Sequence, residues 1–169
     1  MNRKSLILLI SFFSLLFFQI FVFNNMNIFG FVNPIIYIVF LVIYNFDSDQ
    51  TLFILICFLL GFSIDFFSQS GGAHTIATLT MSFLRPILIR NSYGVTSEIP
   101  VSFHTDTRRI NKYTFLSLLF ILHHLIYFSI VFFDLSAVHL ILKNTFLTFM
   151  FSLTLGIMVL NLYRKPNDS

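Results

Sequence analysis

Charged residues are scarce in this sequence of 169 residues. Asp, Glu, Lys and Arg together make up 10% of the chain, whereas 57% is hydrophobic and the mean hydropathy is +0.88. Soluble domains carry about a quarter of their residues as charged ones, so water cannot be the solvent for most of this surface. The composition predicts an all-α integral membrane protein that forms a single domain over residues 1–169.

Cysteine and glutamate are almost absent as well. Cys57 is the only cysteine, which excludes an intramolecular disulfide and a cysteine cluster for a metal ion. Glu98 is the only glutamate, and the sequence has no Gly-x-Ser-x-Gly, His-Glu-x-x-His or phosphate-loop motif. We therefore expect no catalytic residue, no metal, no cofactor and no enzyme activity.

Apolar runs fill most of the chain. They cover residues 6–23, 32–44, 51–67, 75–89, 113–133 and 140–163, and they predict a bundle of six transmembrane helices. The first run follows basic residues as a signal peptide does, but it is too long and lacks a small-x-small cleavage site, so it should remain as a helix. The runs over 32–44 and 75–89 are short for a span, which predicts tilted or imperfect helices there.

The basic residues indicate the orientation of these helices. With six spans and the N-terminus inside, every Lys and Arg except Lys143 falls at or near the cytoplasmic side, as short loops prefer. If 75–89 did not span, residues 72–112 with their five basic residues would lie outside. We predict cytoplasmic termini and a cytoplasmic loop over residues 90–112. The net charge of +3 then reflects topology and predicts no nucleic-acid partner.

Several polar residues interrupt the first two apolar runs. Gln19 lies well inside the first predicted helix, where its amide needs a partner, so it should cement a helix contact. Asn33 and Pro34 suit the first positions of a helix, since Asn caps free N–H groups and Pro has none to lose. Tyr37, one turn further, is expected near the outer membrane interface.

The third and fourth predicted helices meet at a short turn. Gly61-x-x-x-Asp65 permits close helix approach and places a carboxylate where the helix dipole disfavours it. Gly72-x-His74 follows across the turn, so an Asp65–His74 side-chain bridge is the structural interpretation. The alternative is a proton or ligand site at the same pair.

Ionisable groups also lie deeper in the fourth and fifth runs. Arg85 should extend its side chain to the cytoplasm, and Pro86 should loosen the last turn of a helix whose polar face requires burial in the bundle. His123 and His124 point about 100° apart on a helix, so they cannot chelate one ion and should bond to neighbouring helices. Ser152-x-x-x-Gly156 has the spacing of a packing motif.

The order and spacing of these motifs resemble the rod shape-determining protein MreD family. The resemblance covers essentially the whole chain through Gln19, Asn33-Pro34-x-x-Tyr37, Gly61-x-x-x-Asp65, Gly72-x-His74 and Arg85-Pro86. It implies a non-catalytic scaffold in the bacterial inner membrane that binds MreC. It also implies a larger complex with MreB, RodA and the transpeptidase partner of RodA, which guides lateral peptidoglycan synthesis and rod shape.

The MreD family is similar in fold to the S components of energy-coupling-factor transporters. This similarity leaves an alternative function, a substrate-binding S component of a vitamin transporter, because fold alone does not decide function. S components dock through an Ala-x-x-x-Ala surface on their first helix. The first predicted helix here contains no Ala and offers only Ser11 and Ser14 among bulky residues, which weakens the transporter hypothesis.

Overall fold

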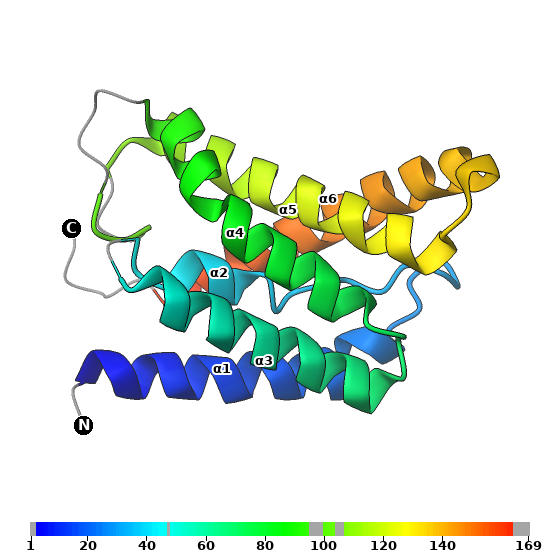
Figure 1. Ribbon diagram of the computed structural model, residues 1–169, viewed down its shortest axis with the longest axis horizontal. Helices are drawn as coiled ribbons and strands as arrows, with labels where there is room; N and C mark the ends of the chain where they lie inside the picture. The colour runs from blue at the N-terminus through cyan, green and yellow to red at the C-terminus, as the bar shows by residue number, and fades with distance from the viewer. Residues whose placement is uncertain (1–2, 47, 95–99, 104–106, 164–169) are drawn as a thin grey trace.

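The structure is a bundle of helices. The computed structural model describes residues 3–46, 48–94, 100–103 and 107–163, apart from the side chains of residues 3, 4 and 135. The elements are α1 (Arg3–Phe21), η1 (Phe23–Asn25), α2 (Val39–Ile43), α3 (Gln50–Ser68), α4 (Ala73–Tyr93), α5 (Arg109–Phe132), η2 (Leu135–Ala137) and α6 (Val138–Leu162) (Figure 1). Over the described residues there is no β-strand, only one isolated bridge between Ile28 and Val32. The predicted all-α class is confirmed.

Four helical stretches are long and apolar enough to cross a membrane. They are Ser5–Asn25, Gln50–Ser68, Arg109–Phe132 and Val138–Leu162. Their outward faces expose large apolar side chains such as Phe13, Phe62 and Phe146, which would be costly in water. The described chain is therefore an α-helical protein with the surface of a multi-pass membrane protein.

Helix α4 is as long as these spans but more polar. It packs between α3 and α5, and its polar face consists of His74, Thr78, Ser82 and Arg85. All four side chains are buried, so protein groups rather than lipid surround them. The prediction that the polar face of this helix is buried in the bundle is confirmed.

The second predicted helix, over residues 32–44, is wrong for most of its length. Only α2 is α-helical, while residues 33–36 have no regular secondary structure and residues 37 and 38 form a turn. We call residues 32–38 the core segment. Longer helices surround it, and Val32 together with all residues from 35 to 44 is at most 8% exposed. Irregular backbone is tolerated at membrane depth where protein groups, not lipid, satisfy its N–H and C=O groups.

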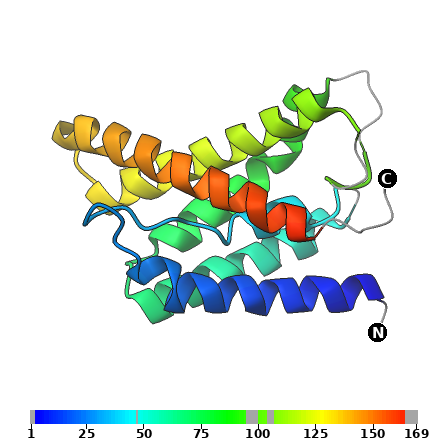
Figure 2. The same ribbon diagram turned by 180° about the vertical axis from the view of Figure 1, so that it is seen from behind.

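The chain runs back and forth along the long axis of the bundle (Figures 1 and 2). Helix α1 leads to the end that holds η1, the α3–α4 turn and η2, and the core segment with α2 leads back. Helices α3 to α6 then alternate in direction, so α1 begins at the end where α6 finishes. Of the predicted loop over 90–112, α4 takes residues up to Tyr93 and α5 those from Arg109; residues 95–99 and 104–106 lie outside the described residues.

Candidate functional site

Asp65, in the last turns of α3, caps the first turn of α4. Its carboxylate accepts hydrogen bonds from the Thr75 N–H at 2.6 Å and from the Thr75 hydroxyl at 2.5 Å. It also accepts from the His74 N–H at 3.1 Å and the Ser70 hydroxyl at 2.5 Å. Gly72, the N-cap residue, has no side chain for this role and adopts a φ of +89°. The carboxylate thus replaces the missing cap and faces the positive end of the α4 dipole.

The predicted side-chain bridge between Asp65 and His74 is wrong. Asp65 contacts the backbone N–H of His74, whereas the imidazole Nδ1 hydrogen bonds with the Tyr37 hydroxyl at 3.1 Å. The physical reason is that the first N–H groups of a helix have no partner within it and point out of its N-terminal end. The carboxylate in the preceding turn meets these groups first, which leaves the imidazole for the interior.

Gly61 allows α3 and α4 to approach closely. A Cβ at this position would lie 2.8 Å from Thr75 Cα and 2.9 Å from the His74 carbonyl oxygen, closer than real Cβ atoms come to backbone. The predicted packing role of Gly61 is confirmed. The same approach brings Asp65, one turn further along α3, to the N-terminus of α4.

Four buried side chains meet at one oxygen atom in the centre of the bundle. The Tyr37 hydroxyl lies 3.1 Å from His74 Nδ1, 2.9 Å from His123 Nε2 and 3.0 Å from Thr78 Oγ1. A phenol has one proton to donate and two lone pairs, so it can donate to one imidazole and accept from the other imidazole and from Thr78. These bonds join the core segment, α4 and α5. The Tyr37 side chain is 0% exposed, so it packs inside the protein, and its position near the outer membrane interface stays a prediction.

His123 and His124 serve different neighbours. His123 bonds with Tyr37, while His124 Nε2 lies 3.0 Å from Ser152 Oγ and His124 Nδ1 lies 2.7 Å from the Phe120 carbonyl oxygen. The prediction that the pair diverges and bonds to neighbouring elements is confirmed. In the described part of the chain, no group of three or more His, Cys, Asp and Glu residues could hold a metal ion.

Gln19 and Ser152 hold the backbone of the core segment. Gln19 Oε1 accepts from the N–H groups of Ile36 at 2.7 Å and Tyr37 at 3.3 Å, and Gln19 Nε2 donates to the Pro34 carbonyl at 3.1 Å. From the other side, the Ile35 N–H donates to Ser152 Oγ at 2.8 Å. The expected helix contact of Gln19 is therefore a contact to irregular backbone.

Asn33 and Pro34 do not begin a helix, in contrast to the prediction. Asn33 Oδ1 accepts from the Asn27 N–H at 2.7 Å, and Pro34 offers its carbonyl to Gln19. The Asn33 side chain thus stabilises the loop before the core segment. Because the next N–H groups find side-chain partners on α1 and α6, no helical turn is needed to satisfy them.

Arg85 does not extend to the cytoplasm as predicted. Its guanidinium is buried and donates to the carbonyl oxygens of Tyr44 and Asn45, the latter at 3.3 Å, where α2 ends. It also lies over the rings of Phe53 and Phe46, at 4.4 and 5.0 Å from their centroids. Carbonyls at a helix C-terminus and aromatic faces both favour a cation, so Arg85 joins α4 to the end of α2.

Pro86 does not end α4, which continues to Tyr93. A proline leaves the carbonyl four residues earlier without its helical donor, and here that carbonyl belongs to Ser82. Gln50 at the start of α3 supplies the donor, because its Nε2 lies 2.8 Å from the Ser82 oxygen. The proline is therefore accommodated by a side chain of a neighbouring helix.

Sequence reasoning missed several members of this network. Ser152 was noted only for its small size, and Gln50 not at all. Asn24 was also missed: its Oδ1 accepts from Gln19 Nε2 at 2.8 Å, and its Nδ2 donates to Ser68 Oγ at 2.6 Å. The available signal was the presence of amides and hydroxyls beside apolar runs, where each must find a partner.

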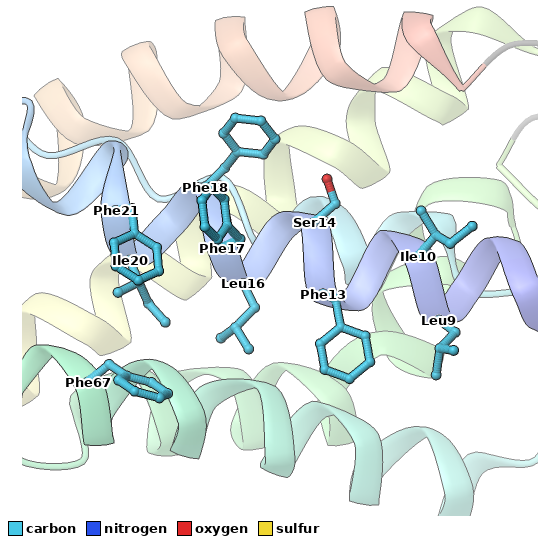
Figure 3. A pocket seen from close by; sticks show the side chains of 10 residues that line it. All are labelled: Leu9, Ile10, Phe13, Ser14, Leu16, Phe17, Phe18, Ile20, Phe21 and Phe67. Carbon is cyan, nitrogen blue, oxygen red and sulfur yellow. The ribbon is translucent and has the colours of Figure 1, made fainter.

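A surface groove on α1 is almost entirely apolar. It measures about 640 Å³ and lies along α1 and the end of α3 (Figure 3). Its walls are Leu9, Ile10, Phe13, Leu16, Phe17, Phe18, Ile20, Phe21 and Phe67, with Ser14 as the one polar residue. Walls of this composition suit contact with hydrocarbon chains. Acid–base chemistry has no group to use there.

No protein-family model, curated protein or solved structure matches this chain.

Proposed function

We propose that this protein is a non-catalytic scaffold of the bacterial cell-elongation complex, of the MreD type. The observation that carries the proposal is the use of the motif residues. Gln19, Pro34, Tyr37, His74 and Arg85 all bond to other elements in the interior, and Asp65 is fully engaged in capping. Residues that bond within the interior in this way stabilise the fold. A stable fold presents a surface to which partners can bind, which is what a scaffold requires.

The proposed topology has six crossings with both termini in the cytoplasm. Four crossings are the long apolar helices. The others are α4, whose polar face is buried, and the core segment with α2, which other elements cover. The alternating path of the chain and the gathering of Lys and Arg towards one side support this arrangement. The proposed location is the bacterial inner membrane.

The proposed partner is MreC, within a larger assembly that contains MreB, RodA and the transpeptidase partner of RodA. Tagged protein purified from detergent-solubilised membranes should carry these cell-wall proteins, identified by mass spectrometry. Depletion should round rod-shaped cells and leave vitamin uptake unchanged. Wild-type protein and Thr154→Val, whose exposed hydroxyl bonds only within its own helix, should both restore shape.

The transporter alternative gives the opposite pattern. Co-purification of an ATPase module, with loss of vitamin uptake and no change in shape, would overturn the scaffold proposal.

A further inference from the structure

The start of α5 carries a groove that combines one cation, several hydroxyl groups and apolar side chains. Its volume is about 550 Å³, and its walls are Arg109, Ile110, Tyr113, Thr114, Ser117 and Leu118. This end of the bundle also holds the start of α1 and the finish of α6 (Figure 1). Arg109 is the first residue of a helix that is long and apolar enough to cross a membrane. In a membrane, the groove therefore lies where the lipid headgroups meet the hydrocarbon.

Arg109 is the one basic residue in this groove. Its basic neighbours pack against rings of the protein: Arg108 lies 5.1 Å from the centre of the Tyr93 ring. Lys112 lies 4.5 Å from the centre of the Phe103 ring. The Arg109 side chain is exposed, and among the described residues no hydrogen bond or ion pair engages its guanidinium. Because a guanidinium presents its donors in a fork that matches a phosphate group, Arg109 is available to an anion from outside the chain.

Two hydroxyl groups lie on the turns that follow Arg109. A Ser or Thr hydroxyl in a helix can donate to the carbonyl four residues earlier, and Ser129 of the same helix does so at 2.7 Å from the Leu125 oxygen. In the part of the chain that the structure describes, neither Thr114 nor Ser117 makes a side-chain hydrogen bond. A hydroxyl without a partner is costly where hydrocarbon replaces water. Both groups can therefore donate to an acceptor that occupies the groove.

The groove continues into an apolar stripe along α5. Ser117, Ile121 and Leu125 follow one another in steps of four residues, so they lie on one face of the helix. Ile121 and Leu125 are each 36% exposed, and Leu118 lines the inner end of the groove. A hydrocarbon chain fits this stripe, whereas a free phosphate ion would leave it unused.

We propose that this groove binds an anionic phospholipid. The lipid phosphate pairs with Arg109, the ester carbonyls accept hydrogen bonds from Thr114 and Ser117, and one acyl chain lies along Ile121 and Leu125. The groove selects an anionic lipid over a zwitterionic one, since a zwitterionic headgroup brings a cation of its own close to the guanidinium. The inference uses only groups of α5 and is independent of the proposed scaffold function.

Binding of two lipids with the same acyl chains tests the proposal. Dioleoyl phosphatidylglycerol is anionic and dioleoyl phosphatidylcholine is zwitterionic, and native mass spectrometry of the detergent-purified protein measures the affinity for each. The wild-type protein should bind the anionic lipid about tenfold more tightly, and Arg109→Gln should lose this preference. Thr114→Val/Ser117→Ala should bind both lipids about three- to tenfold more weakly. Unchanged binding in that double variant, or no preference in the wild-type protein, would overturn the proposal.

Arg90→Gln is the matched control, because Arg90 is an exposed arginine in the last turn of α4, at the same end of the bundle and outside the groove. It should keep the preference for the anionic lipid, and an equal loss in Arg90→Gln and Arg109→Gln would replace the groove by diffuse attraction. Circular dichroism checks that each variant is folded, as expected for side chains that are not buried.

Two further outcomes would assign the groove to another ligand. Glycerophosphoglycerol has the anionic headgroup without acyl chains and should not compete with the lipid at equal concentration. Competition would identify a site for a small anion and overturn the lipid assignment. If Arg109→Gln keeps the lipid preference but loses a co-purified protein, the groove is a protein contact and the proposal is equally overturned.

Discussion

Asp65 shows how single residues accommodate charge in this bundle. Its four hydrogen bonds come from the backbone and hydroxyl groups of the α3–α4 turn, and Arg85 is held in the same manner by carbonyls and rings. Neither residue relies on an opposite charge among these contacts. Asp65 links the end of α3 to the start of α4, and Arg85 links α4 to the end of α2. Both residues therefore stabilise contacts between elements.

Removing the charge of Asp65 should destabilise the protein. In Asp65→Asn, an amide N–H₂ replaces one acceptor oxygen and meets donors of α4, so the free energy of unfolding in detergent should fall by about 2 kcal/mol. Thr75→Val removes one of the same bonds. In a double-mutant cycle, Asp65→Asn should couple with Thr75→Val but add independently to His74→Gln, whose imidazole bonds elsewhere. If Asp65→Asn instead coupled with His74→Gln and not with Thr75→Val, the result would support the side-chain bridge between Asp65 and His74 that the contacts here exclude.

At the scale of elements, the core segment depends on side chains from two distant helices. It has no helical hydrogen bonds over residues 33–36, and Gln19 and Ser152 replace them from opposite sides. A buried backbone group without a partner is costly. These two side chains are therefore structural parts of the second crossing, although neither belongs to it.

Gln19→Leu should test this dependence. The substitution leaves the Ile36 N–H and the Pro34 carbonyl without their partner, and the free energy of unfolding should fall by about 2–4 kcal/mol. The matched control is Ser63→Ala, because the exposed Ser63 hydroxyl bonds to the Leu59 carbonyl of its own helix. Hydrogen exchange should also accelerate at Ile36 and Tyr37. An unchanged stability with unchanged exchange would contradict the assigned role of Gln19.

The elements that sequence predicted well are the long helices, each of which exposes an apolar face. The runs over 51–67, 113–133 and 140–163 correspond to α3, α5 and α6 within a few residues at each end, because an exposed span must be both apolar and helical. Residues 32–44 are equally apolar but face protein on all sides. Hydropathy records side chains and not backbone geometry, so it could not distinguish an irregular buried segment from a helix.

A single site residue was predicted correctly where its partners follow from local helix geometry, and wrongly where they do not. Gly61 and the divergence of His123 and His124 follow from helix geometry alone. The prediction for Arg85 was wrong because the acceptors of its guanidinium, the carbonyls of Tyr44 and Asn45, become available only where α2 ends. The burial of Tyr37 could not be predicted because it follows from the path of the core segment, which no local pattern encodes.

At the scale of the whole molecule, the proposed orientation predicts which turns face each side of the membrane. With Cys57 replaced, a cysteine at Gln69 should react with a membrane-impermeant thiol reagent in intact cells. A cysteine at Thr107 should react only after permeabilisation. Both side chains are exposed, so burial does not obscure the result. The reverse labelling pattern would show that the topology is inverted. Labelling of both positions in intact cells would show that α4 does not cross the membrane.

The hydrogen bond between Ile35 and Ser152 joins positions that are 117 residues apart. A ribosome makes the core segment early and α6 last, so the second crossing lacks one of its two supports until synthesis is nearly complete. Contacts between such distant residues slow folding because chain entropy must be lost before they form. The early helices can insert as they emerge, whereas the polar centre of the bundle closes only when the final helix arrives. Biogenesis of this protein thus ends with assembly of its interior, and a chain cut short before Ser152 has no way to complete it.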